Sequence, residues 1–361
     1  MKNQPDKYKV GIIVPTMNRP DFVIRQLNYY SRLESPHTIY YTDSSNPENA
    51  QIIKTGIDKV GDKLNVVYQH RPAGDTIKSL IELLTAVKEE YVTFIGDDDY
   101  HVPDTLSICT EFLENHPEYR VAMGRSVTIR TRDNKVYGEL TGIHDYARYS
   151  IEADNASERL LDYLGPHFTS IIAAVVPTKN LLRYFKNGEK IKSIDIKGEY
   201  LPCCLMIIDG KLKIVDHLGL IRQIHKSHFR LDDMFDQFTS PEWNADYQEL
   251  RRNVVQGLIT QDKITPQEAE NNFKKAYWLN FQKYISIAYS DNFSPSSSKN
   301  RSKSRMLRTI IASRFPLLKK IYRKIRPILT DKPQLHYEVL QSGSKYHKDF
   351  QDIINSLNKP M

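Results

Sequence analysis

Apolar residues recur in two alternating patterns over the first hundred positions of this 361-residue chain. Compact runs of β-branched and apolar residues predict buried strands, because strands covered on both faces read as continuous apolar segments. Two intervening stretches, 20–33 and 75–87, instead place their apolar side chains at helical spacing. The predicted strands are residues 10–14, 38–41, 64–68 and 91–95. This alternation predicts an α/β fold with an open parallel sheet and right-handed crossovers.

The order of elements changes after residue 100 and becomes mixed. We expect this second half to continue the same sheet, so that residues 1–230 form one domain. The polar helical pattern of residues 231–290 predicts an extension, and residues 291–361 comprise a Ser-rich linker, a basic segment and a polar tail without assigned structure. The expected helices are 103–115, 157–164 and 199–208, and the expected strands are 121–129, 135–140, 171–176 and 213–215.

The net charge of +7 belongs to one segment of the chain. Residues 299–326 contain eleven Lys or Arg and no acid, and the remaining residues carry 40 basic against 44 acidic side chains. A nucleic-acid-binding fold would carry its positive charge on the fold itself. We therefore expect no nucleic-acid partner.

The compartment is predicted from cysteine usage and from the apolar runs. Three cysteines, two of them adjacent, form no disulfide framework and suit a reducing compartment. The amino-terminal residues lack the apolar core of a signal peptide, and no apolar run is long enough to span a bilayer. These features predict a cytoplasmic protein that is soluble or peripheral.

The clearest chemical signal is the run Gly96-Asp97-Asp98-Asp99 directly after the predicted strand 91–95. Ligands bind at the carboxyl ends of strands in open α/β sheets. Three adjacent carboxylates repel one another, and a divalent cation such as Mg²⁺ or Mn²⁺ relieves that repulsion while keeping positions open for phosphate oxygens. The alternative is a solvated acidic turn. We favour the metal because the run follows a buried strand.

A second signal is the turn after the first predicted strand, which reads Pro15-Thr16-Met17-Asn18-Arg19. Its hydroxyl, amide and guanidinium groups suit contacts to a nucleotide. An ordinary turn in which Asn18 caps the next helix would explain the same residues. The glycine fingerprints of dinucleotide-binding sheets and of P-loops are both absent from the sequence at this turn.

Together these segments, with Asp43-Ser44-Ser45 after the second strand, resemble the GT-A-fold glycosyltransferases of family 2. The family pattern at the first turn is roughly P-[TS]-Y-N-R, which here has Met17 in place of Tyr, and Gly96 to Asp99 correspond to its DXD motif. The resemblance covers about residues 8–230. It implies a Rossmann-like open mixed sheet flanked by helices, with a nucleotide-binding half at 1–100 and an acceptor half at 101–230.

The resemblance also implies roles for individual residues. Asp43 would meet the base or ribose, and Asp97 and Asp98 would face ribose and diphosphate. The residues expected to bind the nucleotide sugar are Pro15, Thr16, Asn18, Arg19, Asp43, Arg71, Gly74, Lys78, Asp97, Asp98 and Arg222. The residues expected to bind Mn²⁺ or Mg²⁺ are Asp99, Asp97 and His225. A lone histidine is more often a structural hydrogen-bonding residue.

Inverting members of the family place an acid at the head of a helix in the second half, as general base for the acceptor hydroxyl. Glu199 is the first candidate here and Asp195 the second. A carboxylate at that place could instead complement the helix dipole. His167 is a further candidate on the acceptor side.

The resemblance thus predicts a metal-dependent transferase acting in polysaccharide biosynthesis, with a glycan or lipid-linked glycan of the bacterial surface as acceptor. Residues 299–326 space apolar side chains among cations, which suits the anionic inner face of the cytoplasmic membrane. A solvated helix packed on the domain is the alternative for that segment. Alternatives for the whole protein are a sugar-1-phosphate nucleotidyltransferase, a non-catalytic basic protein that binds nucleic acid or membrane, and an inactive scaffold of the same fold.

Overall fold

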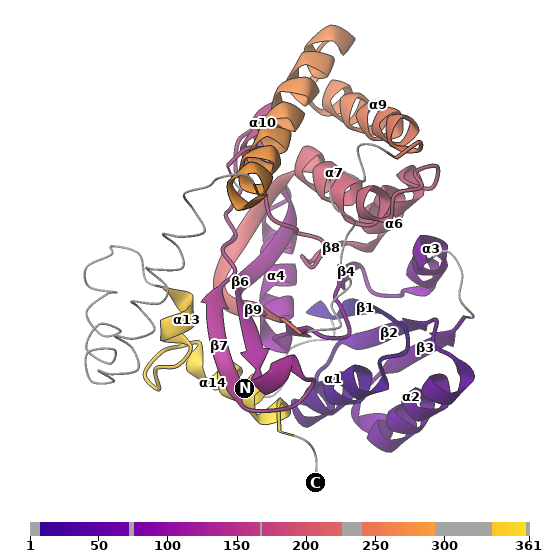
Figure 1. Ribbon diagram of the computed structural model, residues 1–361, viewed down its shortest axis with the longest axis vertical. Coiled ribbons are helices and arrows are strands. Elements are labelled where there is room, and N and C mark those ends of the chain that lie inside the picture. The colour runs from indigo at the N-terminus through magenta and orange to yellow at the C-terminus, as the bar shows by residue number, and fades with distance from the viewer. Residues whose placement is uncertain (1–7, 72–75, 167, 226–239, 293–333, 359–361) are drawn as a thin grey trace.

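A computed structural model describes residues 8–71, 76–166, 168–225, 240–292 and 334–358. Strands β1, β2, β3 and β4 lie together at the lower right of the view, with helices α1 and α2 below them and α3 above (Figure 1). The five-stranded sheet has the order β3-β2-β1-β4-β8, in which only the edge strand β8 is antiparallel to its neighbour. Its strands are β1 Val10–Thr16, β2 Thr38–Asp43, β3 Val66–His70, β4 Tyr91–Phe94 and β8 Val176–Pro177.

The first three connections of this sheet are the helices α1 (Pro20–Arg32), α2 (Pro47–Val60) and α3 (Thr76–Ala86). The predictions for α1 and α3 are confirmed, whereas α2 was not predicted. Asn46 caps α2 by accepting a hydrogen bond from Asn49 N at 2.9 Å, and Pro47 occupies its first turn. The helix has few apolar positions, and its caps are the only strong sequence signal for it.

The prediction that the second half continues the same sheet is wrong. Its long strands form a separate four-stranded sheet of order β5-β9-β6-β7, in which β6 and β9 run parallel. An isolated bridge between Ala122 and Val175 joins this sheet to the region of β8. Gly124 and Gly219 lie so close that a Cβ on either would meet the other's backbone at 2.6 Å, which explains both glycines. The strands are β5 Tyr100–His101, β6 Tyr119–Thr131, β7 Leu140–Asp145 and β9 Lys211–Gln223.

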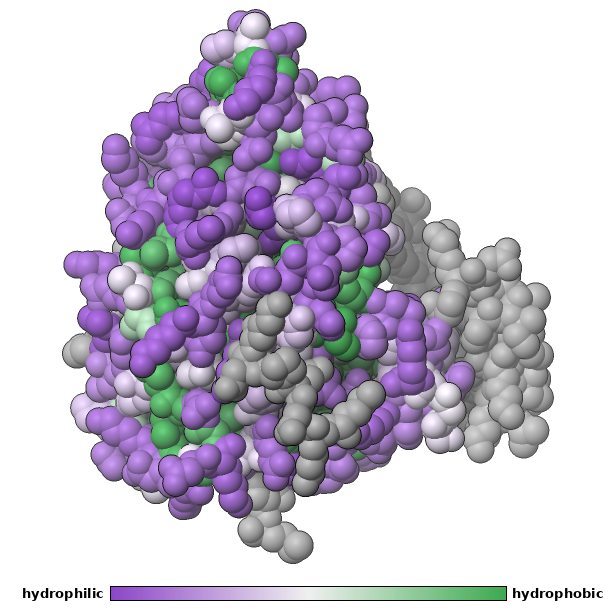
Figure 2. Space-filling model, turned by 180° about the vertical axis from the view of Figure 1, so that it is seen from behind, coloured by the Kyte–Doolittle hydropathy of each residue, from purple (hydrophilic) through white to green (hydrophobic). Residues whose placement is uncertain are grey.

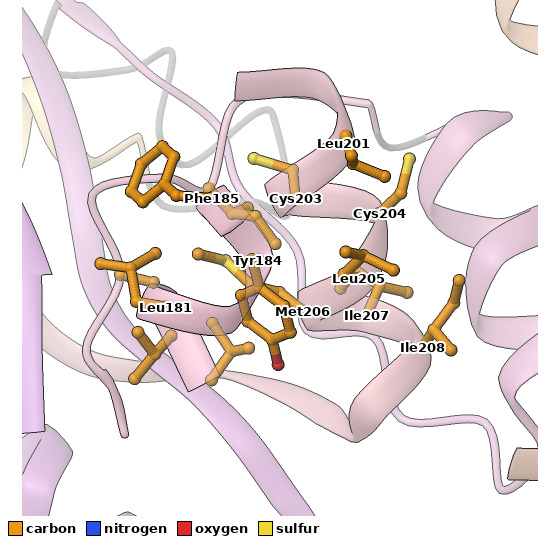
Figure 3. Close-up of a cluster of buried hydrophobic side chains, with 14 of the residues drawn as sticks. Leu181, Tyr184, Phe185, Leu201, Cys203, Cys204, Leu205, Met206, Ile207 and Ile208 are labelled. Carbon is orange, nitrogen blue, oxygen red and sulfur yellow. The ribbon is translucent and has the colours of Figure 1, made fainter. Parts of the chain in front are cut away.

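Helix α7 (Leu201–Asp209) is apolar on all sides and buried. It packs against Leu181, Tyr184 and Phe185 of α6 (Thr178–Asn187), as Figure 3 shows. The extension helices α9 (Trp243–Asp262) and α10 (Pro266–Asn292) contribute to the same core, so they are built onto the domain. The remaining helices of this half are α4 Pro103–Asn115, α5 Ala156–Leu164 and a π-helical turn at Ile196–Tyr200, and single 3-10 turns lie at Gly61–Lys63 and Arg132–Asn134.

The carboxyl-terminal residues return to the domain, where no structure was assigned from sequence. Helices α13 (Leu335–Glu338) and α14 (His347–Ser356) bury Phe350 and Ile353 in the core shared with the first sheet. Ser356 Oγ donates to Tyr100 Oη at 2.9 Å, directly behind the acidic run. This segment therefore supports the strand ends at which the predicted site lies.

Most of the face seen from behind is hydrophilic, with hydrophobic residues showing in narrow bands (Figure 2). Within the described residues, no helix is both long enough and apolar enough to cross a membrane.

Candidate active site

The three predicted motifs meet at the carboxyl edge of the first sheet. Strand β1 ends at Thr16 and β2 at Asp43, and these two residues are paired in register. Strand β4 ends two residues before Gly96 and leads into the acidic run. Thr16 Oγ1 donates to Asp97 Oδ2 at 2.7 Å, which ties the first turn to the acidic run across the parallel strands.

Arg19 bridges two of the three aspartates. Its Nη1 lies 2.9 Å from Asp97 Oδ1, and its Nη2 lies 2.9 Å from Asp98 Oδ2. The guanidinium stacks over the ring of Phe22 at 4.4 Å from the centroid. The sequence predicted a metal as the means of holding these carboxylates together, and the structure shows Arg19 paired with two of them.

His225 reaches the same point from beyond the end of β9. Its Nε2 lies 2.6 Å from Asp98 Oδ2 and 2.8 Å from Arg19 Nη2, and the ring is buried against Phe22. The imidazole nitrogen, a carboxylate oxygen and a guanidinium nitrogen thus converge within hydrogen-bond distance of one another.

The aspartates differ in their electrostatic environments. Burial raises the pKa of Asp97 to about 7, although the positive charge of Arg19 opposes the rise. Burial also acts to raise the pKa of Asp98, but the hydrogen bond from His225 and the charge of Arg19 outweigh it and hold that pKa well below its ordinary value. Asp98 is therefore the carboxylate of the run that stays ionised.

Two residues of α1 hold the main chain of the acidic run. Arg25 is buried and donates through Nη2 to Asp98 O at 2.7 Å, with its guanidinium over the Tyr100 ring at 4.7 Å. Gln26 Nε2 donates to Gly96 O at 3.1 Å and to Asp99 O at 3.0 Å. Sequence reasoning missed both residues. Their signal was a polar pair on the otherwise apolar inner face of the helix.

Asp99 faces β9. Its Oδ1 accepts a hydrogen bond from Gln223 N at 3.0 Å. Burial, followed by the charge of Asp98, raises the pKa of Asp99 well above its ordinary value, while Arg222 opposes the rise. The Gln223 side chain accepts from Arg25 and donates to Lys135 O at 2.8 Å, so the end of β9, the acidic run and α1 form one polar network.

The first turn and the loop after β2 are joined by Asn18, whose φ of 56° is in the left-handed region that asparagine tolerates. Its N–H donates to Ser45 Oγ at 2.7 Å, and its Oδ1 accepts from Asn46 N at 2.9 Å. Asp43 is fully buried and accepts from Ser45 N at 2.8 Å and from Tyr68 Oη at 2.5 Å. These hydrogen bonds join the first turn and the loop after β2 into one continuous rim at the carboxyl edge of the sheet.

The other residues predicted to bind the nucleotide sugar do not all join the polar network around the acidic run. Arg71 forms an ion pair with Glu82 at 2.5 Å, and its N–H donates to Asp43 O at 2.7 Å. Lys78 is exposed on α3. Pro15 is half-buried in β1. Gly74 and His167 lie outside the described residues.

The candidate bases lie around the π-helical turn that precedes α7. Asp195 directly precedes the turn, and Glu199 lies within it; both are half-buried. Gly198 packs close to Ile77 in the first turn of α3, and α3 begins at the carboxyl edge of the sheet. Burial, followed by the charge of Glu199, raises the pKa of Cys203 to about 12. Whether either acid acts as a base stays a prediction.

The donor set is suited in part to a divalent cation. In the described ranges, no group of three or more His, Cys, Asp or Glu side chains is arranged to hold a metal ion. Asp98 and His225 nevertheless offer an oxygen and a nitrogen at one point, and the missing Cβ of Gly96 makes room for Asp98, since a Cβ there would lie 2.4 Å from Oδ1. Mg²⁺-type sites commonly take one or two protein ligands and fill the rest with phosphate oxygens and water.

Comparison with known proteins gives matches of sequence and of fold. Residues 11–177 match the family model described as glycosyl transferase family 2. The structure of S. aureus TarS 1-349 in complex with UDP-GlcNAc is 17% identical, with 80% of this chain and 77% of that chain covered and a TM-score of 0.51.

Two further structures are less similar in fold. A longer TarS chain from S. aureus is 17% identical at a TM-score of 0.49, with 80% of this chain covered; this chain spans 46% of that chain's length. The mannosyltransferase PcManGT from Pyrobaculum calidifontis, in complex with GDP-Man and Mn²⁺, is 14% identical, with 85% and 81% covered and a TM-score of 0.44. The expected fold and family resemblance are confirmed: the chain has a GT-A fold, and its residues 11–177 match the model of glycosyl transferase family 2.

Proposed function

We propose that this protein is a glycosyltransferase that moves a sugar from a nucleotide diphosphate sugar to a hydroxyl of a glycan or lipid-linked acceptor. The observation that carries the proposal is the convergence of Arg19, Asp98 and His225 at the carboxyl edge of a family-2 sheet. In open α/β sheets this edge is where ligands bind.

The donor would lie along the rim made by the first turn, the loop after β2 and the acidic run. Asn18 and Asp43 shape the wall at which we place the nucleoside, and Arg19 supplies positive charge where we place the diphosphate. A guanidinium matches phosphate oxygens in a paired geometry. We assign Asp97, which Thr16 and Arg19 hold, to the ribose. UDP-GlcNAc, which the TarS structure contains, is the first donor to test.

Asp98 and His225 are the residues that we assign to hold Mn²⁺ or Mg²⁺, in place of the set Asp99, Asp97 and His225 that the resemblance implied. Oxygen and imidazole ligands together suit Mn²⁺. A bound cation would neutralise charge on the leaving diphosphate. The contact of Asp98 with His225 favours this assignment, whereas the Asp99 carboxylate is bonded to the Gln223 amide.

Glu199 is our proposed general base for the acceptor hydroxyl, with Asp195 as the second candidate. The π-helical turn that carries Glu199 packs on the start of α3 at the carboxyl edge, and π-helical turns are frequent at functional sites. A base must come within hydrogen-bond reach of the hydroxyl that it deprotonates. A base at this place would give inversion at the anomeric carbon.

We also propose that the protein attaches to the anionic inner face of the cytoplasmic membrane. The basic segment 299–326 lies outside the described residues, and α10 leads toward it. Trp278 is 62% exposed and Ile285 is 50% exposed on α10, and no acid occurs between Glu270 and Asp291. Exposed tryptophan beside lysine suits a membrane interface.

Release of nucleoside diphosphate from a panel of sugar nucleotides tests the proposed activity. Wild-type protein should release it from at least one donor in the presence of Mn²⁺ or Mg²⁺, and Asp98→Asn should abolish the release. Exposed Asp62 lies on the 3-10 turn before β3, at the opposite end of the strands from the carboxyl edge, so Asp62→Asn serves as the control. Equal release by wild type and Asp98→Asn would contradict the proposal.

A further inference from the structure

Two arginines outside the acidic run lie against one tyrosine. The guanidinium carbon of Arg148 is 4.1 Å from the ring centroid of Tyr146, and that of Arg222 is 5.7 Å from the same centroid. Arg222 Nη1 also donates to Tyr146 Oη at 3.2 Å. Arg148 follows β7 and Arg222 lies near the end of β9, so two segments far apart in sequence bring two positive charges together.

Arg148 has few protein partners. Its Nη1 donates to Ser170 O at 2.6 Å, and its Nε is buried without a hydrogen-bond partner. None of the carboxylates in the described residues forms an ion pair with it. Arg148 is half-buried, so its guanidinium loses part of its hydration, and no ion pair within the described ranges offsets that loss.

The pKa of Arg148 also reflects its burial and its closeness to Arg222. Burial lowers the pKa of Arg148, and the charge of Arg222 adds to that effect. An anion would relieve both the missing hydrogen bonds and the repulsion between the arginines. Phosphate suits the task because a guanidinium pairs with two of its oxygens at once.

The position of the pair relates it to the candidate active site. The charge of Arg222 acts to lower the pKa of Asp99 in the acidic run. The charge of Arg148 acts to lower the pKa of Cys203 at the start of α7, and the charge of Glu199 acts to raise the same pKa. The pair therefore lies within electrostatic range of both the acidic run and the start of α7.

We propose that Arg148 and Arg222 form a phosphate-binding subsite, which takes either the diphosphate of the donor or a phosphate group of the acceptor. This placement on the reaction path rests on the proposed function, but the capacity of the pair to bind phosphate does not. Arg222 was assigned to the nucleotide sugar from the resemblance, whereas Arg148 carried no expectation.

Titration of the full chain with inorganic phosphate, followed by phosphorus NMR line width, tests the subsite without substrate. Arg148→Gln should weaken phosphate binding about tenfold or more, as expected for the loss of charged hydrogen bonds. Arg148→Lys should restore part of the affinity. Arg130 is exposed on β6, so Arg130→Gln removes one charge elsewhere and should leave the affinity unchanged.

Repeating the titration at saturating UDP and Mn²⁺ distinguishes the two sources. Loss of phosphate binding would assign the subsite to the donor diphosphate, and retained binding would assign it to the acceptor. Equal phosphate affinity of Arg148→Gln, Arg130→Gln and wild type, with unchanged melting temperatures, would overturn the proposal. If no nucleotide binds, the proposed function fails, but the phosphate titration without nucleotide still decides the subsite.

Discussion

His225 Nε2 lies 2.6 Å from Asp98 Oδ2, although 127 positions separate the two residues in sequence. Arg19 lies within hydrogen-bond distance of both. A lone histidine downstream of the family motif thus returns to the middle aspartate of the acidic run. Because of this contact, we assign Asp98, and not Asp99, as the carboxylate that would share a cation with His225.

Substitution of single aspartates separates the two metal assignments. Asp98→Asn should abolish Mn²⁺-dependent binding of a nucleoside diphosphate, because it removes the ionised oxygen that faces His225. Asp99→Asn should retain metal-dependent binding, since Asp99 is bonded to Gln223 N. Calorimetry with and without Mn²⁺ measures both. The reverse pattern would return the ligand role to Asp99.

Gly96→Ala tests whether the acidic run needs the close approach of Asp98. A Cβ at residue 96 would lie 2.4 Å from Asp98 Oδ1, so the carboxylate that contacts His225 must shift. We expect nucleotide affinity in Mn²⁺ to fall about tenfold or more, as for a lost charged interaction. A Cβ at Gly343 meets nothing within 4 Å, so Gly343→Ala is the matched control. Equal affinity of the two variants would show that Asp98 can shift without cost.

The sequence predicted the strands that carry the site because each is a short apolar run ended by polar residues at one sheet edge. It did not predict Arg25 or Gln26, since a polar residue on a buried helix face has no partner until the fold supplies the acidic run. The second sheet was missed for a similar reason. Strands β6 and β9 pair in parallel although residues 132–210 lie between them in the chain, and local periodicity does not contain such a contact.

The carboxyl-terminal helix should contribute to stability. Phe350 in α14 is fully buried, so Phe350→Ala should lower the free energy of unfolding by about 3–5 kcal/mol. Denaturant unfolding measures the change. Exposed Lys348 lies in the same helix, and Lys348→Ala should change the free energy by less than about 0.5 kcal/mol. Similar values for the two variants would mean that α14 does not dock on the domain in solution.

Asp349 in the same helix gives a pH dependence with a defined sign. Burial, followed by the charge of Asp104, raises the pKa of Asp349 from 3.8 to about 6. The folded protein therefore keeps this proton when the unfolded chain has lost it, and the resulting stability is complete below pH 3.8 and lost as the pH rises through 6. Asp349→Asn should gain stability relative to wild type over that window. If the free energies of unfolding of wild type and Asp349→Asn changed in parallel from acid to neutral pH, the raised pKa of Asp349 would be contradicted.

The membrane proposal needs a test that leaves α13 and α14 in place, because both pack in the core. Replacement of the eleven Lys and Arg residues at 299–326 by Gln should release the protein from anionic vesicles. Trp278→Ala should weaken vesicle binding less, and release of nucleoside diphosphate should be unchanged in both variants. Vesicle co-sedimentation measures the binding. Undiminished sedimentation of the Gln variant would remove the basic segment from the proposal.

The most direct test of the central claim is the melting temperature of the full chain against a panel of nucleoside diphosphates and sugar nucleotides, each with and without Mn²⁺. A ligand that binds only the native state must raise the melting temperature. We predict that one base stabilises the protein, that the stabilisation needs Mn²⁺, and that Asp98→Asn loses it. The absence of a shift with every member of the panel would contradict the account of this edge as a nucleotide sugar site.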